Sequence, residues 1–109
     1  MKYTIKDLIN KIHTSERTIA IYCETEEEAK LTIRILYDHG ISWVVERDDN
    51  KDLTFFDQCQ NGIVYWIDKN FFKLKITRSS IEYALEEVKK GHLTDLVKAK
   101  DIKFSLQNW

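Results

Sequence analysis

The sequence predicts an α+β fold, a two-layer sandwich in which about three helices cover one face of a mainly antiparallel sheet of four or five strands. The chain has 109 residues, of which 43% are hydrophobic. That is enough for one core and too little for two, so residues 1–109 are expected to form a single domain. Apolar residues follow a helical period in three segments and a strand period in others. Their order, α-β-α-β-(loop)-β-β-α-(β), alternates too seldom for a doubly wound parallel sheet.

Capping signals mark the start of each predicted helix, over residues 4–13, 26–38 and from 79 to about 90. The capping pairs are Thr4 with Asp7, Thr25 with Glu28, and Ser79 with Glu82. In such a pair, each side chain accepts a hydrogen bond from a backbone amide that the first helical turn leaves unpaired. Gly40 and Gly91 supply the left-handed position that ends the second and third helices.

Strands are predicted where β-branched and aromatic residues gather, at residues 17–23, 41–46, 63–67 and 71–77. The last two are expected to form a hairpin turning at Asp68-Lys69-Asn70. Residues 47–62 form a long polar loop, in which Asp52 or Thr54 caps one helical turn. The tail is expected to hold a helical turn at 95–98 and a strand at 102–106.

The second helix carries apolar residues on two sides. One stripe is formed by Ala29, Ile33, Leu36 and Tyr37, whereas Leu31 and Ile35 lie on a different side of the helix. Either the first helix packs on this second side, or it is a surface for a partner or a second copy, so a monomer and a homodimer both stay open. In the third helix a single stripe is formed by Ile81, Ala84, Leu85 and Val88.

The sequence shows no recognisable catalytic or metal-binding motif. Asp48-Asp49-Asn50-Lys51-Asp52 lacks the glycine and the final glutamate of a calcium loop, and His13, His39 and His92 are isolated. We therefore expect no enzyme activity, no metal and no cofactor. No apolar run could span a membrane, no secretion signal is evident, and Cys23 and Cys59 are interpreted as thiols, so we expect a cytoplasmic protein.

Acidic residues form the first candidate site. The chain carries a net charge of −1, but residues 1–57 hold 8 basic and 12 acidic residues, against 9 and 6 in residues 58–109. The candidate partner-binding residues are Glu24, Glu26, Glu27, Glu28, Asp48, Asp49 and Asp52. Such a patch could copy the charge of a phosphate backbone or engage a basic groove of a protein. The same residues also have explanations that need no partner. The helix dipole favours glutamates in a first helical turn, and a solvated loop favours aspartates.

The hairpin offers a second candidate site. Lys73 and Lys75 are expected to share a face with Tyr65 or Trp66, and Arg78 follows. Basic and aromatic side chains on an open sheet can hold single-stranded nucleic acid. Lysine on an outward strand face is equally typical of solubility and edge protection.

The segment IAIYC-E-TEEEAK-LTIRILYDHGISW, residues 19–43, resembles a small domain of phages and prophages of low-GC Gram-positive bacteria. The hairpin YWIDKNFFKLKI is loosely similar to a hairpin of those proteins. The likeness ends after Trp43, where Val44-Val45-Glu46 replaces Ser-Gly and a further Trp.

The resemblance implies an accessory protein of a mobile element. We therefore expect a non-enzymatic protein that inhibits a bacterial host protein through its acidic residues, with a CRISPR nuclease as one such target. A nucleic-acid-binding accessory using the hairpin, or a self-associating phage protein using Leu31 and Ile35, are the alternatives.

Overall fold

A five-stranded mixed sheet forms the centre of the computed structural model, which describes residues 3–14, 18–43, 54–59, 61–70, 73–91 and 94–103. The strand order is β3-β5-β4-β2-β6. The strands are β2 (Thr18–Cys23), β3 (Ser42–Trp43), β4 (Ile63–Asn70), β5 (Lys73–Ser80) and β6 (Thr94–Lys98). β4 is antiparallel to both β2 and β5, whereas β2–β6 and β3–β5 are parallel pairs. The predicted α+β class is confirmed, and the sheet is mixed rather than purely antiparallel.

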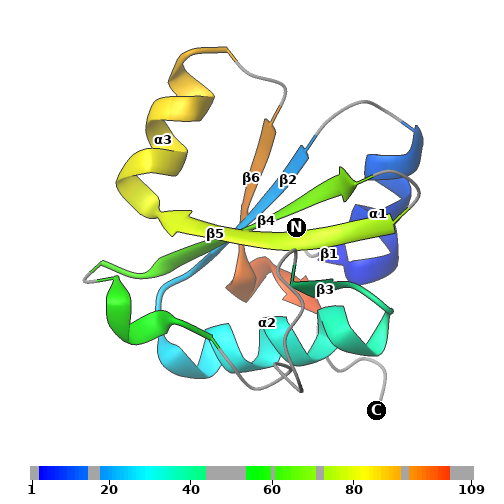
Figure 1. Ribbon diagram of the computed structural model, residues 1–109, viewed down its shortest axis with the longest axis horizontal. Coiled ribbons are helices and arrows are strands. Elements are labelled where there is room, and N and C mark those ends of the chain that lie inside the picture. The colour runs from blue at the N-terminus through cyan, green and yellow to red at the C-terminus, as the bar shows by residue number, and fades with distance from the viewer. Residues whose placement is uncertain are drawn as a thin grey trace.

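Helices lie on both faces of this sheet (Figure 1). α1 (Ile5–Thr14) and α2 (Glu26–Asp38) cover the face that bears Ile19, Ile21 and Cys23, and α3 (Ile81–Lys89) packs on the other. The expected sandwich is therefore formed by α1 and α2, and α3 adds a partial third layer. The reason is that the second face is also apolar, with Ala20, Val64 and Leu96. A short parallel pair, β1 (Tyr3–Thr4) with β7 (Ile102–Lys103), lies beside the main sheet.

Helix caps follow the sequence closely at two of three positions. Asp7 N donates to Thr4 Oγ1 at 3.1 Å, and Glu28 N donates to Thr25 Oγ1 at 3.2 Å. α3 differs, because its cap is Ser80, whose hydroxyl accepts from Tyr83 N at 3.1 Å. Ser79 instead belongs to β5, where its hydroxyl accepts from the Trp66 indole at 2.8 Å.

The hairpin is longer than predicted. β4 runs on to Asn70, which pairs with Lys73, so the predicted turn at 68–70 lies inside a strand. Residues 71–72, which join the strands, lie outside the described residues. The pairing of Trp66 with Thr77 and of Ile67 with Ile76 outweighs the local turn preference of Asp68 and Asn70.

The C-terminal part corrects a second prediction. Residues 95–98 are not helical, because they belong to β6 and pair in parallel with β2. The helical turn comes next, as η2 (Ala99–Asp101), and β7 covers only the first two residues of the strand predicted at 102–106. The helical turn expected in the long loop is present as η1 (Phe56–Gln58). Its N-cap is Phe55 and not Thr54, although Phe56 N donates to Thr54 Oγ1 at 3.3 Å, and Asp52 lies outside the described residues. Residues 44–53, including the end of the strand predicted at 41–46, lie outside the described residues.

The main core lies between the sheet and the pair α1–α2. The Trp43 ring meets the rings of Phe55 and Tyr65 edge-on, at centroid distances of 5.2 and 5.7 Å. The apolar core between the sheet and α3 is smaller. Ala84 is fully buried, but Leu85 is 52% and Val88 38% exposed, so the α3 stripe covers the sheet only in part. No helix among the described residues is long and apolar enough to span a membrane.

Candidate functional site

The start of α2 presents a group of exposed carboxylates. Glu24, Glu26 and Glu27 are exposed, and Glu28 turns back so that its Oε1 accepts from Glu24 N at 2.8 Å. Glu24 Oε1 lies 3.5 Å from Lys100 Nζ of η2. Acidic side chains are stabilised at this end by the partial positive charge of the helix N-terminus. The local sequence thus places the four glutamates of the predicted set together at the start of α2.

A further carboxylate reaches the same end of the sheet from α3. The Tyr22 hydroxyl donates to the Asn61 carbonyl at 2.8 Å, and the Asn61 amide donates to Glu82 Oε2 at 2.8 Å. The hydrogen bond from the Asn61 side-chain amide is the main cause that lowers the pKa of Glu82, which favours the ionised carboxylate. Burial raises the pKa of Tyr22, and the charges of Glu24, Glu82 and Glu28 raise it further. Carboxylates from the turn before α2, from α2 and from α3 therefore lie near enough to this phenol to affect its pKa.

We name this cluster the acidic surface and define it as Glu24, Glu26, Glu27, Glu28 and Glu82. In Figure 1 both α2 and α3 begin on the left, α3 at the end of β5 and α2 well below it in the view. Glu82 was missed because it joins the cluster only through tertiary structure, and the sequence shows it simply as a capping residue. Asp48, Asp49 and Asp52 lie outside the described residues.

Gly62 allows the two strands beneath the acidic surface to lie close together. Its φ is +98°, and a Cβ built there would lie 2.6 Å from the Cys23 carbonyl oxygen and 2.7 Å from Tyr22 Cε1. Only glycine fits such a conformation at such a distance. Gly62 thus fixes how Asn61 meets the Tyr22 hydroxyl.

The basic and aromatic residues of the hairpin do not form a single face. Because successive side chains of a strand alternate, Trp66, Lys73 and Lys75 point to the α3 side of the sheet, and Tyr65 and Arg78 to the other. Tyr65 is fully buried and donates to the Thr54 carbonyl at 2.6 Å, so it cannot stack on a base. Tyr65 must therefore be removed from the proposed nucleic-acid site.

Arg78 takes part in the packing of η1. Its guanidinium lies 3.8 Å from the centre of the Phe55 ring, and it donates to Gln58 Oε1 at 3.0 Å. Trp66 is half-buried, and its ring meets the exposed Tyr83 ring at 6.3 Å. Of the residues predicted for the nucleic-acid site, Lys73 is exposed, and Lys75 and Trp66 are half-buried on the same face of the sheet.

The two residues predicted for self-association differ in burial. Leu31 is 51% exposed, whereas Ile35 is half-buried and packs against the main core. They do not form one continuous exposed apolar patch, because Ile35 is turned partly inward.

The cysteines are free thiols, as expected. Cys23 is fully buried and donates to Thr32 Oγ1 at 3.4 Å, and burial raises its pKa to about 12. Cys59 follows η1 and is half-buried, which is less exposure than its polar surroundings suggest. Cys23 is consequently protonated and a poor nucleophile at neutral pH.

Two of the histidines, which the sequence shows as isolated, line one groove. His13, in the last turn of α1, and His39, at the end of α2, share it with Ser42, Lys73 and Lys75. His92 lies outside the described residues. Within the part of the chain that the structure describes, no three His, Cys, Asp or Glu side chains are placed to hold a metal ion.

Comparison with known protein families, curated proteins and solved structures finds no match to this chain.

Proposed function

We propose that this protein is a non-enzymatic inhibitor that places its acidic surface on a basic site of a bacterial host protein. The target class that the phage resemblance favours is a CRISPR nuclease. The observation that carries the proposal is that Glu24, Glu28 and Glu82, from the turn before α2, from α2 and from α3, all lie near enough to Tyr22 for their charges to raise its pKa.

Fixed geometry is the first support. Glu28 is held by the Glu24 amide, and Glu82 by the Asn61 amide, each at 2.8 Å. Side chains that are already ordered lose less conformational entropy when a partner binds. Carboxylates held in this way can therefore occupy a site that a partner uses for nucleic-acid phosphates.

Exposure is the second support. Glu26 and Glu27 are exposed next to the ordered pair, so they can contact a partner. Charged groups at the edge of an interface speed association and set specificity more than they add affinity. We therefore expect binding that is fast at low salt and weakens as salt rises.

The test is a charge reversal with a control variant that reverses the same number of charges elsewhere on α2 and α3. Glu26→Lys with Glu27→Lys changes the acidic surface. Asp38→Lys with Glu86→Lys makes the same change in net charge at exposed positions outside it. Each reversal in the first turn costs about 0.3–1 kcal/mol of helix stability, a small part of the ~5–15 kcal/mol of a typical domain. Far-UV circular dichroism checks that both variants fold.

The readout is RNA-guided DNA cleavage by purified CRISPR nucleases of low-GC Gram-positive bacteria, with the protein in excess. The wild type and the Asp38/Glu86 variant should slow cleavage, and the Glu26/Glu27 variant should not. Inhibition by the Glu26/Glu27 variant at wild-type strength would exclude the acidic surface. Cleavage unaffected by the wild type would exclude these nucleases as the target.

A further inference from the structure

The outer edge of β6 is open among the described residues. β6 is the last strand in the order β3-β5-β4-β2-β6, and all five of its residues pair with β2 without a bulge. An open edge offers unpaired backbone amides and carbonyls to another strand, and proteins usually protect it with charged residues, proline or a bulge. Asp95 and Lys98 are charged, but the middle of β6 holds Leu96 and Val97. This edge can therefore accept another strand.

α3 leaves an apolar stripe exposed on the side of this edge. α3 and β6 lie side by side at the upper left of Figure 1. The Tyr83 ring meets the ring of Trp66 in β4, so Tyr83 lies on the β4 side of α3. Successive helical residues are about 100° apart, which places Leu85 about 200° from Tyr83 and therefore on the β6 side. Leu85 and Val88 are exposed, and Leu96 is half-buried on the same face of the sheet.

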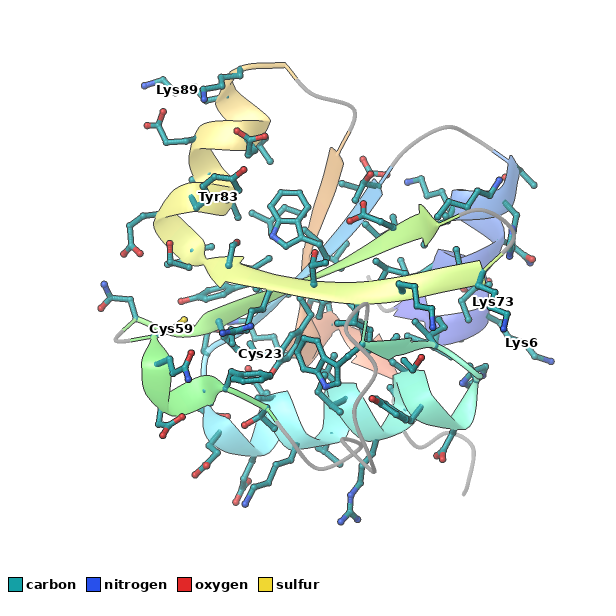
Figure 2. All side chains as sticks on the ribbon, viewed as in Figure 1. Lys6, Cys23, Cys59, Lys73, Tyr83 and Lys89 are labelled. Carbon is teal, nitrogen blue, oxygen red and sulfur yellow. The ribbon has the colours of Figure 1, made fainter. Side chains whose placement is uncertain are left out.

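The charges on α3 fit a second copy of α3 that runs in the opposite direction. Glu82 and Lys89 are exposed and lie seven residues apart, about two helical turns, so they point to the same side. Around the helix they lie within about 60° of Leu85. Figure 2 shows Lys89 at the far end of α3 from Tyr83. When two such helices lie antiparallel, Glu82 of each faces the partner's Lys89, and Leu85 lies between the two ion pairs.

A second copy of this chain would cover the strand edge and the stripe together. A stable dimer buries about 800 Å² of each copy, more than Leu85 and Val88 expose, so β6 and α3 must both take part. We infer that this protein forms a two-fold dimer in which β6 pairs antiparallel with the partner's β6 and α3 packs against the partner's α3. The two-fold axis is perpendicular to the sheet, so both α3 helices lie on one face and run antiparallel.

This dimer goes beyond the function proposed above. Of the acidic surface, only Glu82 belongs to the dimer interface, because Glu26 and Glu27 lie on α2, which covers the other face of the sheet. Leu85 stays exposed in the monomer, so a substitution there affects the free energy of unfolding only at concentrations at which the dimer forms.

The first test is sedimentation velocity of the full chain over a concentration series. The wild type should sediment as a dimer of two 13.0 kDa chains. Leu85→Lys should raise the dissociation constant about tenfold or more. The matched control is Leu31→Lys on α2, because Leu31 is 51% and Leu85 52% exposed, and it should change the constant less than about twofold. A wild type that stays monomeric up to about 100 µM, or an equal effect of both variants, would overturn the inference.

A charge exchange tests the antiparallel arrangement of the helices. Glu82→Lys or Lys89→Glu alone places like charges against each other at both ends of the helix pair, and each should weaken the dimer about fivefold or more. The double variant restores opposite charges and should bind within about threefold of wild type. A double variant that adds the two losses would exclude this helix pairing. Circular dichroism verifies that every variant folds.

Amide hydrogen exchange tests the pairing of β6. At a concentration at which the wild type is dimeric and Leu85→Lys is monomeric, the amides of residues 95–98 that face away from β2 should exchange more slowly in the wild type. Equal exchange in the two proteins would exclude β6 from the interface. None of these measurements depends on inhibition of a host protein.

Discussion

Removing one buried hydroxyl, by Tyr65→Phe, tests how the segment before β4 is held. The Tyr65 hydroxyl donates to the Thr54 carbonyl at 2.6 Å, and both residues are buried. The substitution keeps the ring and its edge-on contact with Trp43 at 5.7 Å. What it loses is the donor, which leaves a buried carbonyl unsatisfied. Such a group costs about 1–3 kcal/mol, so we expect that loss in the free energy of unfolding.

Urea denaturation measures this loss, and thermal unfolding should shift by about 4–8 °C for each kcal/mol. Tyr83→Phe is the control, because Tyr83 is 55% exposed and its variant should stay within about 0.5 kcal/mol of wild type. Equal stability of Tyr65→Phe and wild type would refute the reasoning, as would an equal loss in both variants.

Alkaline pH gives the same prediction a second readout. Burial is the main cause that raises the pKa of Tyr65, so folding favours the neutral phenol. In the unfolded chain a tyrosine ionises near pH 10 or so. The stability that Tyr65 contributes is therefore present below that pH and is lost as the pH rises toward the folded-state pKa. Tyr65→Phe should show a shallower decline of stability above about pH 10 than wild type.

Three further predictions concern packing elsewhere in the protein. Gly62→Ala combines a positive φ with a Cβ placed 2.6 Å from the Cys23 carbonyl oxygen, and should cost about 2–4 kcal/mol in urea denaturation. A maleimide should label Cys59 in the native protein and reach Cys23, whose pKa burial raises to about 12, only on unfolding; two equally fast thiols would contradict this. Ala84→Leu should cost about 1–3 kcal/mol because Ala84 is fully buried, whereas Leu85→Gln, at a position 52% exposed, should change the stability by less than about 0.5 kcal/mol.

The sequence predicted well whatever depends on neighbours in the chain. The Thr4 and Thr25 caps and the left-handed Gly40 follow from local chemistry, and all are observed. The predictions failed where strand pairing overrides a local preference. Asp68 favours a turn, yet it lies within β4 opposite Lys75. Residues 95–98 form a strand because β2 offers them an edge to pair with.

The same distinction explains what was predicted of the sites. The glutamates at the start of α2 are consecutive, so the sequence shows them directly. Glu82 comes near them only because β2 and β5 end at the same end of the sheet, on either side of β4. His13 and His39 line one groove only because α1 and α2 end near the start of β5. Strand alternation predicts that Tyr65 and Trp66 lie on opposite faces of the sheet. It does not predict which of these two residues points into the main core, because that depends on how the helices pack. Contacts between distant segments cannot be read from spacing alone.

The acidic surface is tested most directly by the association rate constant of the protein with a CRISPR nuclease of the proposed target class, measured at low and at physiological salt. Electrostatic steering predicts a rate constant that falls about tenfold or more as salt rises, and a Glu26→Lys/Glu27→Lys variant that is slow at both salt concentrations. A wild-type rate constant that does not change with salt and is matched by the variant would contradict the account.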